Sequence, residues 1–372
     1  MKIICEKSNL LKGVNIATKA VAVKTTMNIL ECVLIDATTD IIKLTCNDME
    51  LGIETRIEGS IVSKGMVAID AKVFSEIIRK LPDSDVTIET RQEEESVISV
   101  ITCEKSVFEI TSRKGDDFSF LPYIEKTDSI SISQFTLKDI IRQTIFSIAA
   151  SDTNRPMTGE LFEVNDDTLR VVSLDGHRIS IRRIELSDHY APRKVIVPGK
   201  TLNEISKILS GEADNHVEIS FAANHILFEF DQTMVVSRLI EGEYFRIDQM
   251  LSGDFDTRIV INKREFMNCI DRATLLISES DKKPIILDIT DENIRLSIKS
   301  QLGNMEEDIA ISKEGKDLMI GFNPKFLLDA LRVIDDDEIT LYMINSKAPC
   351  FIKDERESYI YLILPVNFSG NR

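Results

Sequence analysis

The sequence predicts an α+β protein that consists of three repeated domains. Its 372 residues exceed what one compact core holds, and a hydrophobic content of 43% is enough for several cores. Three similar segments start at residues 66, 194 and 319, and they read MVAIDAKVFSEIIRKL, KVIVPGKTLNEISKIL and MIGFNPKFLLDALRVI. Each has a short apolar strand, a turn, and then apolar residues at helical spacing. We therefore expect each segment to be one part of a repeating domain.

The other elements repeat in the same order along the chain. Each repeat begins with a helical pattern, in SNLLKGVNIATKAV, FTLKDIIRQTIFSIAA and NKREFMNCIDRATLLI. Two short strands around an acidic turn follow, at residues 32–45, 160–173 and 285–298. After the strand, turn and helix of the first paragraph, each repeat has an acidic turn and a further strand, in DVTIET, HVEISF and EITLYM. The prediction is three domains, residues 1–126, 127–253 and 254–372, each with two helices and several strands.

Composition limits the classes of protein that fit this chain. The N-terminus MKIICEKSN has no apolar run of signal-peptide length, and no segment approaches the roughly 18 apolar residues of a membrane span. The six cysteines are scattered and contain no CxxC pair, which is typical of reduced core residues. We therefore expect a cytoplasmic protein with no membrane association, and we expect no cofactor and no metal.

Charge is distributed unevenly along the chain. The net charge of −17, taken alone, argues against a nucleic-acid partner. Six predicted helical segments are nevertheless net positive, namely residues 8–24, 71–81, 136–150, 199–210, 262–277 and 324–334. Lys72, Lys200 and Lys325 occupy one repeat position, and a second basic residue follows each of them seven residues later on the same helix face. A solvated surface explains one such helix, whereas six of them indicate helices that face an anion.

The stretch VVSLDGHRIS, residues 171–180, raises the question of an active site. Asp175 and His177 could form a base and its orienting partner in a hydrolase. No GxSxG, HExxH, Walker loop or DxD pattern accompanies them, and Asp-Gly is a favoured turn between strands. A polar turn is therefore the stronger interpretation, and catalysis is the weaker alternative.

Taken together, several features resemble the bacterial sliding clamp, the β subunit of the DNA polymerase III holoenzyme. They are the DGHR stretch, the ending YIYLILPV at residues 359–366, the SKAP turn at 346–349, and the threefold repeat. The resemblance implies a DNA clamp fold, in which each domain places two helices inside and antiparallel sheets outside. It also implies a non-catalytic processivity factor, with two chains joined head to tail in a ring around double-stranded DNA.

Helix geometry supports two chains. Packed helices lie about 10 Å apart, so twelve helices in a circle leave an opening of roughly 28 Å, whereas six leave about 9 Å. Only the larger ring admits a duplex, which it would contact without sequence specificity. A protein scaffold that does not bind DNA stays as the alternative.

The resemblance also assigns site residues. It implies a pocket that binds short peptides of the replicative polymerase, the clamp loader and repair proteins, formed by Met157, Leu174, Gly176, His177, Arg178, Ile179, Phe245, Gln249, Met250, Lys347, Pro349, Leu362, Ile363, Leu364, Pro365 and Val366. The family usually has proline where Phe245 and Ser252 stand, and a basic residue where Gln249 and Asn367 stand. The tail SGNR extends beyond the usual end. One wall of the pocket is therefore expected to differ in shape.

Two further groups follow from the resemblance together with the repeated charges. The residues expected to face DNA are Lys12, Lys19, Lys24, Lys72, Arg79, Lys138, Arg142, Asn154, Arg155, Lys200, Lys207, Lys263, Arg272, Lys325 and Arg332. The residues expected at the dimer interface are Phe108, Leu275 and Leu276.

Overall fold

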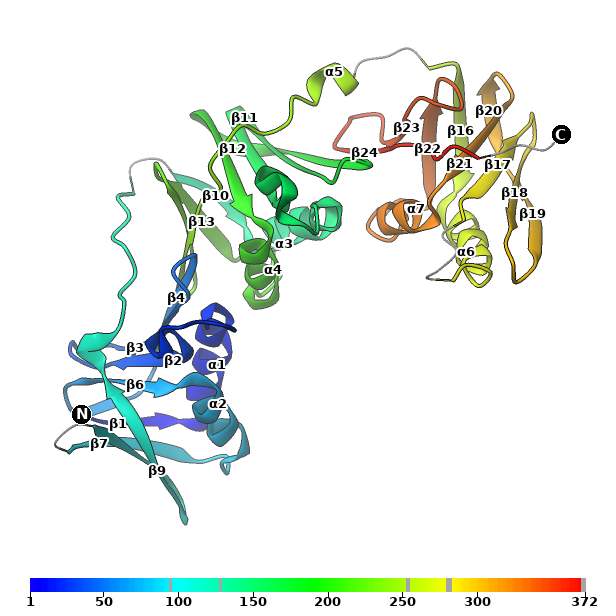
Figure 1. Cartoon of the computed structure of the whole chain (residues 1–372). Coiled ribbons are helices and arrows are strands. Elements are labelled where there is room, and N and C mark those ends of the chain that lie inside the picture. The colour runs from blue at the N-terminus through cyan, green and yellow to red at the C-terminus, as the bar shows by residue number, and fades with distance from the viewer. Residues whose placement is uncertain (94–95, 127–128, 252–254, 279–282, 369–372) are drawn as a thin grey trace. The chain divides into compact units, whose positions relative to one another are not determined.

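The chain forms two compact units. The computed structural model describes residues 1–93, 96–126, 129–251, 255–278 and 283–368, and Figure 1 labels its elements. Unit 1 holds residues 1–138 and 200–239, and unit 2 holds residues 139–199 and 240–372. The boundary between the two units falls inside helices α3 (Gln134–Thr144) and α4 (Gly199–Ile208). The two predicted domain boundaries, after residues 126 and 253, lie at or beside residues outside the described ranges, and they stay predictions.

Unit 1 is built on one antiparallel sheet of 13 strands. The strands are β1 (Lys2–Glu6), β2 (Cys32–Asp36), β3 (Ile42–Asn47), β4 (Leu51–Ile57), β5 (Ser60–Ser63), β6 (Met66–Asp70), β7 (Asp85–Gln92), β8 (Val97–Cys103), β9 (Ser106–Lys114), β10 (Ser129–Ser133), β13 (His216–Phe221), β14 (His225–Phe230) and β15 (Thr233–Arg238). Strand β4 of the first repeat pairs with β15 of the second, with Thr55 opposite Thr233. The two hydroxyls are hydrogen-bonded at 2.9 Å. One sheet therefore continues from the first repeat into the second.

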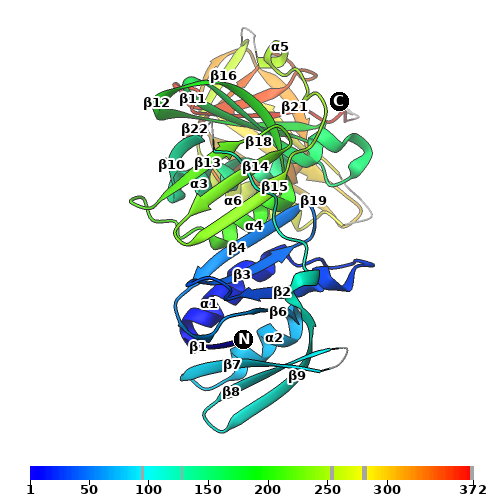
Figure 2. The same ribbon diagram turned by 90° about the vertical axis from the view of Figure 1, so that its left-hand side faces the viewer.

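Two helices cover the part of this sheet that belongs to the first repeat. Helices α1 (Lys7–Ala17) and α2 (Ala71–Lys80) lie side by side in both ribbon views (Figures 1 and 2). Each buries one face, with Leu10 and Val14 in α1 and Phe74 and Ile78 in α2. This is the amphipathic spacing that the sequence shows.

Unit 2 contains a sheet of seven strands and a sheet of four. The strands are β11 (Gly159–Leu174), β12 (Arg178–Pro198), β16 (Thr257–Asn262), β17 (Ile285–Ile289), β18 (Asn293–Lys299), β19 (Asn304–Ala310), β20 (Ser312–Gly315), β21 (Leu318–Phe322), β22 (Glu338–Met343), β23 (Cys350–Lys353) and β24 (Tyr359–Ile363). All pairs are antiparallel, and β12 of the second repeat pairs with β24 of the third. A sheet again continues across a junction between repeats.

Helices α6 (Lys263–Thr274) and α7 (Pro324–Leu331) pack together on the strands of the third repeat. Their buried side chains, among them Phe266 and Leu327, join the core that both sheets share. The amide side chains of Asn262 and Asn323 accept backbone hydrogen bonds at the two helix starts. A further single-turn helix, α5 (Asp248–Leu251), precedes the third repeat.

The six predicted helices are present, and all of them end before their predicted ends, two by more than one helical turn. The segment predicted at residues 8–24 is α-helical only to Ala17, and a 3-10 turn then leads to an extended Val21. The segment predicted at 136–150 starts earlier and ends at Thr144, which leaves the helical region with φ −124°. Helix α5 was not predicted, since four residues are too few for a periodic pattern.

The acidic turns of the first and third repeats separate two strands each, as predicted. In the second repeat the turn lies inside β11, where the register with β12 shifts on both sides of Asp166 and Asp166 has φ +57°.

All six cysteines are buried and free, as the sequence predicts. Among the described residues, no helix is both long and apolar enough to cross a membrane.

Candidate functional site

The DGHR stretch is a tight turn between β11 and β12. The Asp175 carboxylate accepts hydrogen bonds from the backbone N–H groups of His177 at 3.0 Å and Arg178 at 3.2 Å. Gly176 has φ +88°, a conformation that glycine adopts without strain. Asp175 therefore shapes the turn, which is the interpretation that the sequence favoured.

The catalytic alternative has no geometric support. The ring of exposed His177 lies beside the ring of Phe326, with centroids 5.9 Å apart. In the described part of the chain, no hydrogen bond joins that ring to the Asp175 carboxylate, which instead binds the backbone and Arg178. A histidine base needs such an orienting partner.

Arg178 connects three elements inside unit 2. It is 7% exposed, and its guanidinium bonds Asp175 at 3.1 Å, Asp329 of α7 at 2.7 Å, and the carbonyl oxygen of Phe146. The same group lies over the rings of Phe146 and Phe326, at 5.3 and 4.7 Å from their centroids. Arg178 is therefore a buried residue that holds these three elements together.

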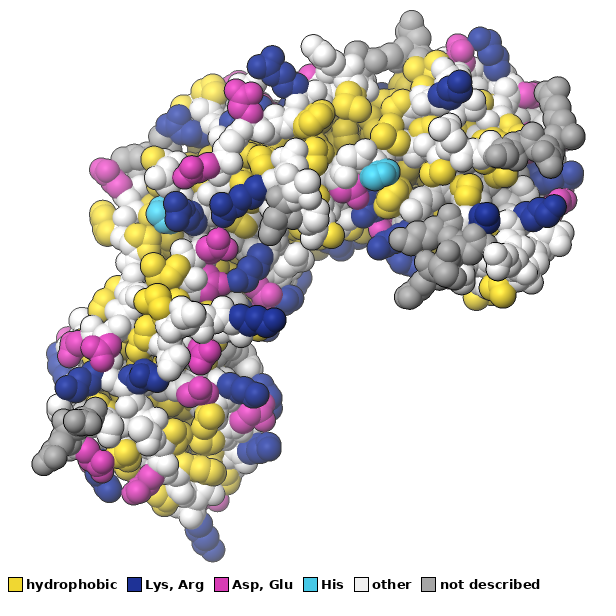
Figure 3. All heavy atoms as spheres, viewed as in Figure 1, with side chains coloured by type: hydrophobic (Ala, Val, Ile, Leu, Met, Phe, Trp, Pro, Cys, Tyr) yellow, Lys and Arg dark blue, Asp and Glu magenta, His cyan; other side chains and the backbone are white. Residues whose placement is uncertain are grey.

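One face of the seven-stranded sheet is apolar. We call it the apolar face, and its buried members are Leu161, Val172, Leu174, Ile179, Ile181, Ile196, Ile240, Tyr244, Ile247, Phe351, Ile360 and Leu362. Met157 and Leu364 pack against it and stay partly exposed. Figure 3 shows hydrophobic side chains gathered in this region, over β12, β24 and the segment that leads to α5.

The apolar face brings together five of the residues predicted for the peptide pocket, namely Met157, Leu174, Ile179, Leu362 and Leu364. The exposed residues Gly176 and His177 lie at its edge, where the His177 carbonyl accepts a hydrogen bond from the Leu364 N–H at 2.9 Å. An apolar surface with a polar edge suits a bound peptide.

Two predicted pocket residues lie on the opposite face of the sheet. Arg178 and Ile363 are paired across β12 and β24, one position from Ile179 and Leu362. Successive side chains of a strand point to opposite faces, so Ile363 packs into the core of the third repeat. These two side chains therefore do not share the apolar face with Ile179 and Leu362, and their part in the pocket stays a prediction.

In the stretch 240–251 the buried residues are not the ones predicted for the pocket, and the pocket role of the predicted ones stays a prediction. Tyr244 and Ile247 are buried in the apolar face, and the Tyr244 hydroxyl donates to the Val172 carbonyl at 3.1 Å. The predicted Phe245, Gln249 and Met250 are exposed instead, with Phe245 at 56%. The burial of Tyr244 and Ile247 could have been inferred from the helical spacing of Tyr244, Ile247 and Leu251.

The remaining predicted pocket residues lie outside the buried cluster of the apolar face. Lys347 is exposed and Pro349 is partly exposed, in a turn that Asn345 holds by accepting the Lys347 N–H at 2.9 Å. Pro365 is partly exposed, while Val366 is exposed and donates its backbone N–H to Gly321 of β21. Ser252 and the SGNR tail lie outside the described residues.

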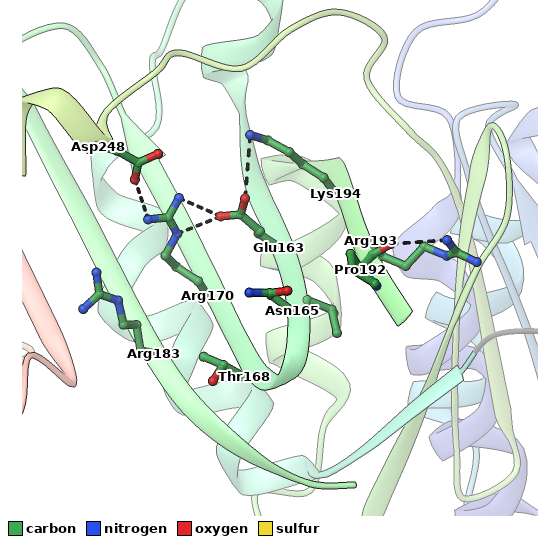
Figure 4. Close-up of a pocket in the computed structure, with 10 residues that line it drawn as sticks. Glu163, Asn165, Thr168, Arg170, Arg183, Pro192, Arg193, Lys194 and Asp248 are labelled. Atoms are coloured by element: carbon green, nitrogen blue, oxygen red, sulfur yellow. Dashed lines mark hydrogen bonds and ion pairs between the residues drawn. The ribbon is translucent and has the colours of Figure 1, made fainter. Parts of the chain in front are cut away.

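A polar depression of about 590 Å³ lies on β11 and β12 (Figure 4). Its charged lining residues are Glu163, Arg170, Arg183, Arg193, Lys194 and Asp248. Arg170 points between two carboxylates, Glu163 at 2.6 Å and Asp248 at 2.8 Å. Sequence reasoning missed this depression because its residues carry no recognisable motif.

The residues predicted to face DNA divide into two groups. Lys12, Lys24, Lys72 and Lys325 are exposed, and none of them has an ion-pair partner among the described residues. Lys19 is partly exposed, and Asn154 and Arg155 are exposed within the 3-10 segment Asp152–Thr158. The free lysines are the ones best suited to bind an external anion.

The second group already has partners within the chain. The ion pairs are Arg79–Glu76, Arg142–Asp139 and Arg142–Asp335, Lys200–Asp48, Lys207–Glu204, Arg272–Glu307 and Arg332–Asp271. The ammonium groups of Lys138 and Lys263 donate to the carbonyls of Leu209 and Ile334. These side chains would have to exchange a partner in order to bind DNA. Arg332 lies just after α7, which is electrically neutral within its own bounds.

The three residues predicted for a dimer interface are differently exposed. Phe108 of β9 is 39% exposed, and Leu275, directly after α6, is 77% exposed. Leu276 is partly buried against the core of its own repeat. Phe108 and Leu275 are therefore available for a partner, and Leu276 contributes mainly to the fold.

Asp166 and Asp167 at the acidic turn of β11 come together with His189 of β12, although no metal-ligand spacing is visible in the sequence. Asp166, Asp167 and His189 are all exposed, and their ligand atoms lie within 4.8 Å of one another. The Asp166 hydrogen bond to His189, 2.7 Å long, raises the pKa of the imidazole. We interpret the group as an ion pair on a solvated turn.

Comparison with known proteins covers nearly the whole chain. Models of the DNA polymerase III beta subunit match it in three parts: the N-terminal domain at residues 1–122, the central domain at 131–245 and the C-terminal domain at 248–367. A beta sliding clamp of Staphylococcus epidermidis is 32% identical over 98% of this chain and 99% of its own length. The chain belongs to the DNA polymerase III beta subunit family.

Solved beta subunit structures have the same fold. A putative DNA polymerase III beta subunit from Eubacterium rectale is 65% identical, with a TM-score of 0.96 over 99% of this chain and 100% of that one. The DNA polymerase sliding clamp from Bacillus subtilis is 32% identical, with a TM-score of 0.95 and the same coverage. The predicted family and its clamp fold of three repeated domains are thereby confirmed.

Proposed function

We propose that this beta subunit is a processivity factor for DNA replication and not an enzyme. Two copies form a closed ring head to tail around duplex DNA, slide without sequence specificity, and tether the polymerase and other clamp-binding proteins. Family membership along the full length supports this function. A cytoplasmic location is part of this proposal, because the proposed partner is DNA. The three domains are proposed at residues 1–126, 127–253 and 254–372.

The position of three lysines carries the proposal for DNA. Lys72, Lys200 and Lys325 are each the second residue of a helix, in α2, α4 and α7. A cation at a helix N-terminus is unfavourable, because the helix dipole is positive there. Its repetition in a chain of charge −17 therefore indicates a role outside the helix. Contact with phosphate is that role for Lys72 and Lys325, and Lys200 would take it up by leaving Asp48. Such contacts carry no sequence information.

Two unpaired strand edges support the dimer. In the described part of the chain, β19 pairs only with β18, and β9 pairs with β6 only through Arg113 and Lys114. Exposed apolar side chains lie on or near these edges, with Val107 and Phe108 on β9 and Leu302 before β19. Bare edges of this kind pair readily with another chain.

The apolar face supports the peptide-binding role. Its accessible members Met157 and Leu364, together with His177 and Pro365, present apolar surface beside polar groups. Clamp-binding peptides of the polymerase, the clamp loader and repair proteins would bind here. Apolar contacts are expected to contribute most of the affinity.

Release of the protein from circular and linear DNA tests the proposed ring. Loaded by its clamp loader onto nicked circular DNA, the protein should remain bound through a high-salt wash, because a closed ring leaves only at an end or an opened interface. One cut in the circle should release it quickly. Equal loss from circles and linear DNA at high salt would exclude encirclement and favour a scaffold that does not enclose DNA.

A further inference from the structure

The polar depression is continuous with the apolar face. Glu163 lies two residues from Leu161 on β11, and Arg170 lies two residues from Val172. On β12, Arg183 is likewise two residues from Ile181. Residues two apart on a strand share a face, so apolar and charged groups follow one another on the same side of the sheet.

The depression is net positive in a strongly negative chain. Four basic residues and two acidic ones line it. Glu163 serves two of the basic residues, with Arg170 at 2.6 Å and Lys194 at 3.8 Å. The side chain of Arg193 points away from the other charged groups (Figure 4). Arg170, Arg183 and Lys194 are therefore the cations that an incoming anion would meet.

A carboxylate of the chain itself already occupies part of the depression. The Asp248 side chain is 72% exposed, and it reaches Arg170 from the single-turn helix α5 (Figure 4). The hydrogen bond from Arg170 lowers the pKa of Asp248, and the charges of Lys194 and Arg183 lower it further. The depression is thus an environment that favours a carboxylate.

Arg183 has capacity for a further partner. Among the residues that the structure describes, its guanidinium reaches one carboxylate, Glu357 at 3.1 Å, and that carboxylate also binds Lys353 at 2.6 Å. The side chain of Arg183 is 32% exposed. A guanidinium has five N–H donors, so most of those on Arg183 stay available to a second acceptor.

We propose that this depression binds the acidic flank of a clamp-binding peptide whose apolar part lies on the apolar face. This inference rests on the peptide-binding role proposed above. The distance from Leu174 to Arg170 along β11 is four residues, or about 13 Å. Val172 between them is buried, and Tyr244 and Ile247 pack in the same cluster, so a bound peptide has to pass over this segment. About four extended residues are therefore the shortest spacer between its apolar part and its acidic side chains. Arg170, Arg183 and Lys194 then select peptides with acidic flanks.

The test uses the clamp-binding peptide of the cognate polymerase in two forms. One form carries two glutamates four residues from the apolar part, and the other carries two glutamines at the same positions. Each form is made in two versions, one with these residues before the apolar part and one with them after it. By isothermal titration calorimetry, the wild-type protein should bind the better acidic version with a Kd about threefold to tenfold lower than that of the matching glutamine version. The ratio of the two Kd values should fall to about one in R183Q/K194Q. It should stay at the wild-type value in R295Q/K299Q, which removes two cations from the other sheet of unit 2.

A second variant covers the case in which R183Q/K194Q fails to fold. Asp248→Asn removes the internal carboxylate, so the preference for the acidic peptide should increase in D248N. If both peptides bind the wild-type protein equally well, the inference is wrong and the peptide-binding role stands. If neither peptide binds, the proposed peptide-binding role itself fails, and the inference fails with it. A short single-stranded oligonucleotide that binds through Arg183 and Lys194 while the peptides show no preference would assign the depression to phosphate and overturn the inference.

Discussion

At the scale of single residues, neighbours in one motif have separate tasks. Asp175 shapes the turn, His177 is exposed at the edge of the apolar face, and Arg178 is buried on the other face. The motif was recognisable in the sequence, but the face of the sheet on which each of its side chains lies was not. In Leu362–Ile363–Leu364 every side chain is apolar, because both faces of β24 are covered, so no alternation shows which residue points where.

Replacement of Arg178 should destabilise the protein strongly. In R178A the carboxylates of Asp175 and Asp329, each only 17% exposed, lose their shared partner. Breaking such a buried pair costs about 3–5 kcal/mol of unfolding free energy, which urea unfolding can measure. The matched control is R295A, whose pair with Asp308 is half exposed and should matter little. Equal losses in the two variants would contradict the structural role of Arg178.

Glu160 should make stability depend on pH. Its side chain is completely buried, and burial raises its pKa to about 8 from 4.5. Between these values the folded protein keeps a proton that the unfolded chain has lost. Stability should therefore fall as pH rises from about 4.5 to about 8, by up to about 1.4 kcal/mol per pH unit, and then level off.

Urea unfolding of wild type and E160Q at pH 5, 7 and 9 measures this contribution. The advantage of E160Q over wild type should grow between pH 5 and 8, because glutamine carries no proton to lose. E355Q, at an exposed glutamate, serves as the control and should show no such trend. A constant difference between E160Q and wild type across this range would contradict the assignment.

At the scale of elements, periodicity predicted which helices exist but not which basic residues are free. Lys72 and Lys200 occupy equivalent helix positions, yet Lys200 pairs with Asp48 and Lys72 has no ion-pair partner among the described residues. Asp48 lies far from Lys200 in sequence, at the start of a turn before β4, so only the fold reveals the contact. The helix ends at Ala17 and Thr144 were likewise hidden, because 3-10 turns continue the apolar pattern.

The free lysines should dominate DNA binding. Substitution of both Lys72 and Lys325 by glutamine should weaken binding to duplex DNA at low salt and reduce the slope of log K against log salt by about two. K299Q/K316Q removes two exposed lysines outside the helices and should leave the slope unchanged. K207Q, which only breaks an existing pair with Glu204, should have a smaller effect than either free lysine. Fluorescence anisotropy over a salt series provides the comparison.

At the scale of the whole molecule, the repeat extends to the pairing between repeats. Ile53 of β4 pairs with Val235 of β15 at the first junction. The equivalent residues one repeat later are Ile181 of β12 and Ile360 of β24, and they pair at the second junction. The two junctions therefore have the same strands in the same register, although the sequence alone indicated only that the domains repeat.

The same equivalence between repeats predicts which strands pair between two copies of the chain. One repeat beyond Ile181 lies Glu306 of β19, and the position equivalent to Ile360 in the first repeat is Val107 of β9. Both belong to the unpaired edges described above. An antiparallel pair of β19 with β9 of a second copy would place Met305 opposite Phe108. Repeating this contact twice closes a head-to-tail dimer.

A disulfide should therefore form between copies at one register only. Opposite residues on antiparallel strands have Cβ atoms about 4.5–5.5 Å apart, near the range that a disulfide spans, whereas residues three positions out of register lie much farther apart. Oxidised F108C/M305C should migrate as a covalent dimer on a non-reducing gel, and F108C/D308C should stay mostly monomeric. The native cysteines do not interfere, because all six are buried. Light scattering of the wild type should give about twice 42.1 kDa, and F108D/L275D should give the mass of one chain. Y123D, at a residue that is 92% exposed, is the control and should stay dimeric. Efficient cross-linking of F108C/D308C but not of F108C/M305C would show that the register of the repeat does not extend across the interface.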